Sequence, residues 1–189
     1  MRPVALALAA AGVLAGCSTG DGQVDVANGG EFRFVAGTPA GEVIPAGERA
    51  TAPEFSGTLL RGGEFDSAEL AGDVAVLNFW GSWCPPCRVE TPQFEEVYQE
   101  FQDDGAQFLG VNVKDAEQLA VAFLDSKAIT FPSLFDPTGE TALAFRDYPA
   151  TAIPSTIVLD RESRVAAVYT GEVRQDDLRG VLHLVLEES

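Results

Sequence analysis

Basic side chains are scarce in this sequence. Its 189 residues include 12 lysines and arginines against 29 aspartates and glutamates, so the formal net charge at pH 7 is −17. A surface with this excess of negative charge repels the phosphates of nucleic acids and the headgroups of anionic lipids. The composition therefore excludes nucleic-acid binding as a function.

Cysteine and histidine are also rare. The chain has three cysteines, Cys17, Cys84 and Cys87, and one histidine, His183. A structural zinc ion needs four ligands, and neither Cys17 nor His183 is near the pair along the chain, so we expect no metal site. Cys84 and Cys87 are only three residues apart in the chain. A disulfide between them would stabilise the fold by roughly 2 kcal/mol, less than the roughly 3 kcal/mol of a disulfide that closes a 15-residue loop. The pair is therefore expected to serve redox chemistry rather than stability.

The chain has no apolar run long enough to span a bilayer, which takes about 20 residues. Its N-terminal run, Val4–Leu14, follows one basic residue and precedes small residues, a pattern typical of an export signal. The end of this run, Leu14-Ala15-Gly16-Cys17, resembles the lipobox of bacterial lipoproteins. The resemblance implies that residues 1–16 are removed as a signal peptide and that the sulfur of Cys17 carries a diacylglyceryl group. The alternative is a secreted protein with an ordinary cleavage site and a free thiol at Cys17.

The remaining chain is expected to hold a tether and one domain. Residues 17–51 are rich in Gly, Ala, Thr, Pro and Glu and poor in large apolar side chains, which is typical of a flexible linker. Within it, the alternating residues 31–35 offer an additional edge strand. The composition of residues 52–189 and the chain's length indicate one domain with a hydrophobic core.

The stretch Trp83-Cys84-Pro85-Pro86-Cys87 carries the clearest chemical signal. It follows the continuous apolar run 74–80, typical of a buried strand, and precedes an amphipathic run in which Val89, Phe94, Val97 and Phe101 recur at helical spacing. If Cys84 caps the helix, Cys87 lies one turn inside it, close enough for a disulfide to form and break. The partial positive charge of a helix N-terminus also favours the thiolate form of Cys84, the nucleophile of thiol–disulfide exchange.

The periodicity along residues 52–189 predicts an α/β fold. A hairpin comes first, then a βαβ unit, a further αβ pair, a helix, an antiparallel hairpin and a final helix. We expect strands at 55–60, 74–80, 108–113, 132–135, 155–159 and 165–170, a helical turn at 67–70, and helices at 86–102, 116–127, 139–146 and 175–186.

Four stretches of this sequence resemble the TlpA/ResA-like branch of the thioredoxin superfamily: Ala52-Pro53-Glu54-Phe55, residues 78–87, residues 90–92, and Ala152-Ile153-Pro154-Ser155-Thr156. The segment 115–135 matches the αβ insertion of that branch. The resemblance implies a thioredoxin-like fold, with a central mixed sheet flanked by helices, an N-terminal hairpin and this insertion. It also implies an enzyme that works through a redox-active disulfide and needs no cofactor.

The resemblance assigns roles to the motif residues. Cys84 resembles the attacking, more exposed cysteine, and Cys87 the buried cysteine that resolves the mixed disulfide. Pro85 and Pro86 lack N–H groups that would otherwise steady the thiolate, so they are expected to tune the reduction potential. Together with Trp83 they are expected to contact the substrate.

A second substrate contact is implied at Ile153 and Pro154. Pro154 resembles the cis-proline of the family, which lies beside the dithiol and leaves the backbone of Ile153 free to pair with an extended substrate segment. The alternative is an ordinary trans proline at the start of a strand, since only about 5 to 6% of X-Pro bonds in folded proteins are cis.

Glu90 resembles the active-site glutamate of ResA-like proteins. A carboxylate near the thiols disfavours the thiolate by its charge, yet it can accept a proton during exchange. The alternative is a solvated helix glutamate, because other glutamates share this helix. Asn78 stands where plain thioredoxin has a buried aspartate, which strengthens the case for Glu90 as proton acceptor.

These residues together predict a membrane-anchored thiol–disulfide oxidoreductase outside the cytoplasmic membrane. The resemblance to the TlpA/ResA-like branch implies that it reduces disulfides in exported proteins such as apocytochrome c, with electrons from a membrane thiol carrier. Alternatives are an oxidant of exported protein thiols and a non-catalytic lipoprotein that binds a partner through the same groove. A thiol peroxidase is disfavoured, because Gly81 stands where peroxiredoxins have a threonine three residues before the reactive cysteine.

Overall fold

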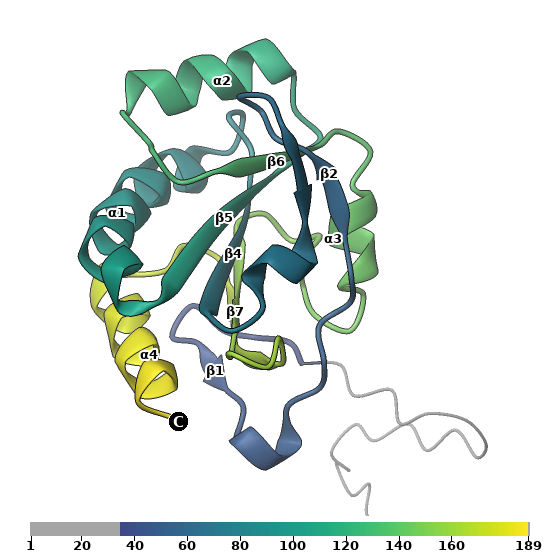
Figure 1. Ribbon diagram of the computed structural model, residues 1–189. Coiled ribbons are helices and arrows are strands. Elements are labelled where there is room, and N and C mark those ends of the chain that lie inside the picture. Colours follow the sequence, from purple (N-terminus) through teal and green to yellow (C-terminus); the bar gives the residue numbers. More distant parts are fainter. Residues whose placement is uncertain (1–34, 189) are drawn as a thin grey trace, which may run out of the picture. The chain divides into compact units, whose positions relative to one another are not determined.

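A computed structural model describes residues 35–188, which form a mixed sheet with helices on both faces (Figure 1). The six strands lie in the order β1-β8-β7-β4-β5-β6. β4, β5 and β6 are parallel to one another, whereas β7 is antiparallel to β4 and to β8. The strands are β1 (Glu42–Val43), β4 (Val74–Trp80), β5 (Ala106–Val113), β6 (Ser133–Asp136), β7 (Ser155–Leu159) and β8 (Val165–Thr170).

The remaining elements cover this sheet. A two-stranded hairpin, β2 (Ser56–Thr58) and β3 (Glu64–Asp66), lies outside it. The helices are α1 (Pro85–Phe101), α2 (Glu117–Ser126), α3 (Glu140–Ala144) and α4 (Gln175–Glu187), with 3-10 turns at Ala46–Glu48, Ser67–Leu70 and Gln102–Asp104. Among residues 35–188, no helix is long and apolar enough to cross a membrane.

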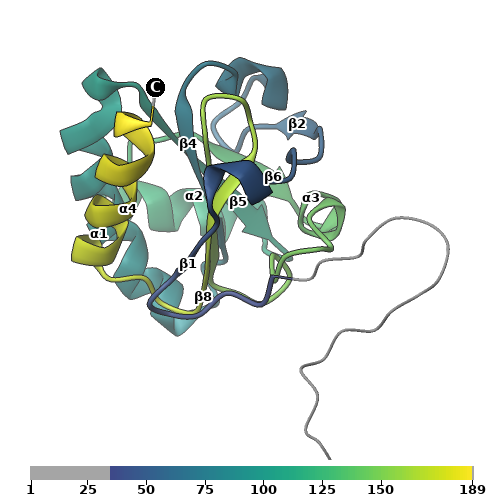
Figure 2. The ribbon, with the colours of Figure 1, turned by 90° about the horizontal axis from the view of Figure 1, so that it is seen from below.

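The central strand is β4, and all seven of its residues are buried. Side chains alternate along a strand, so Val74, Val76 and Trp80 join the core under α1, α2 and α4, whereas Leu77 and Phe79 join the core under the hairpin and α3. Figure 2 shows α1 and α4 on one side of the sheet, and β2 and α3 on the other. The expected α/β architecture, with its N-terminal hairpin and αβ insertion, is confirmed.

The parallel strands determine where the site lies. The carboxyl ends of β4, β5 and β6 meet at one edge of the sheet, because parallel neighbours run in the same direction. The chain leaves β4 at Trp80 and enters α1 at Pro85, so the loop with the first cysteine lies at this edge. Ligand sites of open α/β sheets occur at such edges.

The folded part extends further toward the N-terminus than the expected start at residue 52. Val35 and Ile44 are buried, and β1 pairs with β8 through Glu42↔Val168 and Val43↔Ala167. Residues 35–51 are therefore part of the domain rather than of a flexible tether, and the rest of the expected tether, 17–34, lies outside the described residues. The alternating stretch 31–35 also lies outside them except for Val35, and the edge strand is β1 instead.

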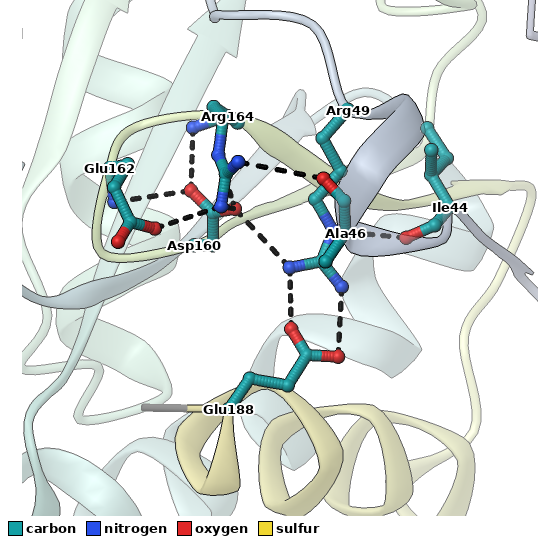
Figure 3. Close-up of polar contacts among 7 residues, drawn as sticks. All are labelled: Ile44, Ala46, Arg49, Asp160, Glu162, Arg164 and Glu188. Carbon is teal, nitrogen blue, oxygen red and sulfur yellow. Dashed lines mark hydrogen bonds and ion pairs between the residues drawn. The ribbon is translucent and has the colours of Figure 1, made fainter.

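A buried arginine explains why this segment is fixed. The Arg49 guanidinium binds both carboxylate oxygens of Glu188, at 2.5 and 3.0 Å, and one oxygen of Asp160 at 3.2 Å (Figure 3). Its Nε donates to the carbonyl of Ile44 at 2.9 Å. Composition did not reveal this network, because its partners lie 111 and 139 residues away along the chain.

The expected elements match their positions to within two residues at each end. Two of them are shorter than expected: the first strand, expected at 55–60 and found at Ser56–Thr58, and α3, expected at 139–146 and found at Glu140–Ala144. The α3 helix ends early because Phe145 leaves helical geometry, with φ −83° and ψ 34°. Its ring packs edge-on against Phe55 and Phe79, with ring centres 5.7 Å apart in each pair. Aromatic packing on the sheet thus stops the helix.

Candidate active site

The two cysteines of the motif form a disulfide at the N-terminus of α1. The sulfurs are 2.07 Å apart and the Cα atoms 5.3 Å apart. Cys84 is the N-cap residue, and its sulfur accepts the Cys87 N–H at 3.2 Å. Pro85 and Pro86 occupy the first two helical positions, where a missing N–H costs no intrahelical hydrogen bond. The helix N-terminus therefore points at the sulfur of Cys84.

Both cysteines are nearly enclosed in this disulfide form. Cys84 exposes 2% of its surface and Cys87 exposes none. The order agrees with the expectation that Cys84 is the more accessible of the two, but the margin is small. Pro85 and Trp83, in contrast, are exposed beside Cys84, so a partner would meet these two side chains first.

Asp115 holds the loop that leads to Cys84. One of its carboxylate oxygens accepts the Ser82 N–H at 2.5 Å and the Asn112 side-chain amide at 3.0 Å. The other accepts the Ser82 hydroxyl and the Ala116 N–H, both at 2.8 Å. No role of Asp115 was predicted from the sequence. The available signal was its position directly after β5, because parallel strands end at the same edge of the sheet.

Trp83 lies beside the dithiol rather than inside the fold. It is 53% exposed, and its indole N–H donates to the carbonyl of Val113 at 3.3 Å. Gly81 makes this position possible, since a Cβ at residue 81 would lie 2.5 Å from the Trp83 Nε1. Trp80, by contrast, is fully buried and donates to the Ser133 hydroxyl at 2.9 Å.

Trp83 and Ile153 both line a cavity of about 180 Å³. The Ile153–Pro154 peptide bond that follows is cis, so the alternative of a trans proline is wrong. The carbonyl of Pro154 accepts the N–H of Gly171 at 2.9 Å, which fixes the start of β7 to the end of β8. Two of the expected substrate contacts, distant in sequence, therefore line one hollow next to the dithiol.

Glu90 lies on α1 one turn beyond Cys87 and is completely buried. Its carboxylate accepts the Asn78 side-chain amide at 2.8 Å and the Val173 N–H at 2.7 Å. Burial raises the pKa of Glu90 from 4.5 to about 7, although these two hydrogen bonds oppose the rise, and the charge of Glu172 adds to it. The alternative of a solvated helix glutamate is therefore wrong.

Asn78 links Glu90 to the strand that follows the cis-proline. Its amide also donates to the Thr156 hydroxyl at 3.2 Å, while its own carbonyl oxygen is buried without a hydrogen-bond partner. Neither the Thr156 hydroxyl nor the Val173 N–H was predicted from the sequence as a partner of this pair. The two positions lie 78 and 83 residues from their partners, so no local pattern indicates them.

One predicted site residue is not part of this arrangement. Cys17 lies outside the described residues. Among residues 35–188, no group of three or more His, Cys, Asp or Glu side chains is placed to hold a metal ion.

Comparisons with known proteins give similarities along most of the folded chain. The model of the AhpC/TSA family matches residues 49–168. The thiol-disulfide oxidoreductase ResA of Geobacillus kaustophilus is 32% identical over 129 residues, which cover 68% of this chain and 72% of the relative.

Solved structures with similar folds carry related descriptions. A DsbF homologue from Corynebacterium diphtheriae superimposes with a TM-score of 0.73 at 36% identity, over 77% of this chain and 92% of that structure. A secreted thiol-disulfide isomerase from Corynebacterium glutamicum gives a TM-score of 0.74 at 32% identity, over 79% of this chain and 93% of that structure. The second description names thiol–disulfide chemistry, to which the Cys84–Cys87 disulfide is suited.

Proposed function

Because the chain belongs to the AhpC/TSA family and is a thioredoxin-fold protein thiol–disulfide oxidoreductase, we propose that it reduces disulfides in exported proteins from a membrane anchor outside the cytoplasm. The observation that carries this proposal is the Cys84–Cys87 disulfide, whose first cysteine caps α1. A helix N-terminus stabilises a thiolate at that position.

The reaction transfers two electrons in two exchange steps. In the reduced protein the Cys84 thiolate attacks one sulfur of a substrate disulfide, forms a mixed disulfide and releases the other sulfur as a thiolate. The Cys87 thiolate then attacks the sulfur of Cys84, which frees the second substrate thiol. The substrate gains two electrons and two protons, and the enzyme ends as the disulfide. A membrane thiol carrier restores the dithiol by the same two steps in reverse.

Glu90 is proposed as the proton acceptor for Cys87. The resolving step requires Cys87 as a thiolate, although its side chain has no exposed surface. Glu90 stands three residues further on the same helix, and side chains at that spacing are neighbours. With a pKa of about 7, its carboxyl group exchanges protons readily near neutral pH.

Substrate contacts are proposed at Trp83, Pro85, Pro86, Ile153 and Pro154. Trp83, Pro85 and Pro86 adjoin Cys84 in the chain, Ile153 lines the same cavity as Trp83, and Pro154 follows Ile153 through the cis peptide bond. The proposed substrates are exported proteins with a disulfide, apocytochrome c among them. The export-signal pattern at the N-terminus and the secreted relative from Corynebacterium glutamicum support a location outside the cytoplasm. The lipobox-like sequence before Cys17 supports a lipid anchor.

The reduction potential of the purified protein tests the proposed direction. A value below about −220 mV is expected for a reductant, whereas a value near −120 mV would make the protein an oxidant of exported thiols. The anchor is tested separately with Cys17→Ser, which is expected to move the protein out of the membrane fraction. A variant that stays in the membrane would remove the anchor from the proposal.

A further inference from the structure

The cavity beside Trp83 has a size and lining suited to one apolar side chain. Its volume is about 180 Å³, slightly larger than the about 150 Å³ of an engineered protein cavity that binds benzene. Val113 and Ala142 form buried parts of the wall, and Leu143 lies at its rim with 60% of its surface exposed. An apolar side chain placed here would bury its own surface together with that of Leu143.

Gly139 keeps the cavity open on the side of α3. Its φ of +80° belongs to the left-handed region that glycine adopts most readily. A Cβ at this position would lie 3.6 Å from the Lys114 Cε and 3.8 Å from a methyl group of Val113, so a larger side chain would extend into the space between them.

Lys114 gives this hollow a positive charge within a strongly acidic protein. It is one of the lining residues, it is exposed, and no carboxylate of residues 35–188 forms an ion pair with it. The net charge of −17 disfavours acidic partners in general. At the rim of this cavity, the ammonium group of Lys114 is available to bind a carboxylate of a partner.

We propose that this cavity is a specificity subsite for the polypeptide substrate: it takes an aromatic or branched aliphatic side chain close to the reactive cysteine, with an acidic residue facing Lys114. The proposal rests on the proposed function, because the substrate segment is placed by its backbone at Ile153, which lines the same cavity. In an extended segment, side chains two residues apart point to the same side. A side chain two positions from the reacting cysteine is therefore within reach of the hollow.

The test uses symmetrical disulfide dimers of short peptides as substrates for the full chain in its reduced form. One peptide carries only glycines around its cysteine, and others carry phenylalanine two residues before or after it. The second-order rate constant of reduction is expected to be about tenfold higher for one of the phenylalanine peptides, the discrimination typical of an apolar pocket. Equal rate constants for all three would overturn the subsite, whereas failure to reduce even the glycine peptide would instead refute the proposed oxidoreductase chemistry.

Matched variants locate the preference. Leu143→Asn is expected to lower the phenylalanine-to-glycine ratio at least fivefold, while Leu119→Asn, at a leucine with similar exposure on α2, leaves the ratio unchanged. An equal response of both variants would overturn the assignment to this cavity. Adding a glutamate to the preferred peptide is expected to raise the rate constant about threefold, a gain that Lys114→Met abolishes and Lys127→Met keeps. A gain that survives Lys114→Met would overturn the role of Lys114.

Discussion

The carboxylate of Glu90 accepts the N–H of Val173 at 2.7 Å and so joins α1 to the turn between β8 and α4. The same carboxylate is held by Asn78 from the central strand. A group with a pKa near neutrality is thereby fixed between three elements of the fold, next to the helical turn that holds the dithiol. Its protonation should influence both stability and the rate of exchange.

Glu90 should make the protein less stable as the pH rises from about 4.5 to about 7. Burial raises the pKa of Glu90 from 4.5 to about 7, so the folded protein binds this proton more tightly than the unfolded chain does. The stabilisation from this bound proton is fully present below the lower pKa and is lost as the pH rises past the higher pKa. The free energy of unfolding falls by about 3 kcal/mol over this range. Urea unfolding of wild type and Glu90→Gln across this range measures it. Parallel pH dependences of the two proteins would contradict the prediction.

The same substitution should change the pH profile of exchange. With Glu90→Gln, the resolving step loses its proposed proton acceptor, so we expect release of the reduced substrate to slow about a hundredfold near neutral pH. Formation of the mixed disulfide on Cys84 should change far less. Stopped-flow measurement of the two phases separates these steps, and Glu95→Gln on the same helix is the control. Equal slowing of both phases would argue against a role in the second step alone.

Removing the Asp115 carboxylate should loosen the loop before Cys84. Its two oxygens accept four hydrogen bonds, two of them from Ser82. Asp115→Ala leaves these donors without their partner, which should cost about 2 kcal/mol of unfolding free energy and also slow substrate reduction. Asp125→Ala, at an exposed ion pair with Arg61, should cost less than 1 kcal/mol. Similar losses in the two variants would show that Asp115 has no special part in the loop.

Arg49 should matter for stability but not for redox chemistry. Its side chain is 1% exposed and pairs with Asp160 and Glu188, at the end of β7 opposite to the cis-proline. Arg49→Met should cost about 3 kcal/mol of unfolding free energy, as expected when one partner of a buried ion pair is removed. Arg179→Met, at a surface pair with Glu100, should change the free energy of unfolding far less. Substrate reduction by the folded Arg49→Met protein should match the wild type, and a large loss would link this network to the active site.

The network should also weaken at low pH. Burial alone would raise the pKa of Asp160, but hydrogen bonds from the Arg164 N–H, the Arg164 side chain and Arg49 together lower it below 3.8. A carboxylate with a lowered pKa adds stability that is present above its unfolded value and is lost as the pH falls through the folded value. Stability measured from pH 5 downward should therefore fall more steeply in the wild type than in Asp160→Asn.

Gly81→Ala should displace the Trp83 ring. A Cβ there would lie 2.5 Å from the indole nitrogen, so the ring must turn away from Val113 and lose its hydrogen bond. We expect a change in tryptophan fluorescence and slower reduction of peptide substrates. Gly180→Ala is the control, because no atom lies within 4 Å of a Cβ at that helical position, and it should stabilise the protein by about 0.5–1 kcal/mol. Unchanged fluorescence in Gly81→Ala would contradict the close approach of ring and loop.

Much of the fold could be predicted because its signals are local. The apolar run at β4, the helical spacing along α1 and α4, and the hairpin of β7 and β8 are each contained within one short stretch of sequence. The spacing was less reliable for the orientation of α1. Val89 is one of the apolar residues that recur at helical spacing, yet it is 52% exposed, whereas Glu90 and Thr91 are buried.

The site shows the same division between local and distant features. The dithiol at the N-terminus of α1 follows from five consecutive residues and from the strand before them. The burial of Glu90 depends on Asn78 and Val173, and the cavity depends on Trp83, Val113 and Ile153 meeting at one edge of the sheet. Such contacts arise only from the packing of separate elements, so no pattern in the sequence alone could place them.

Trapping of the mixed disulfide shows whether Cys84 attacks the substrate and Cys87 resolves the intermediate. A Cys17→Ser, Cys87→Ser protein, reduced and then mixed with excess insulin, is quenched with acid and analysed by mass spectrometry. We expect one insulin molecule bound through Cys84 per protein molecule, its two chains still joined by the disulfide that was not attacked, and no turnover, while Cys17→Ser alone reduces insulin. Absence of any insulin adduct on Cys84 in the Cys87→Ser protein, or insulin reduction at the Cys17→Ser rate by a protein that lacks both Cys84 and Cys87, would show that these roles are wrong.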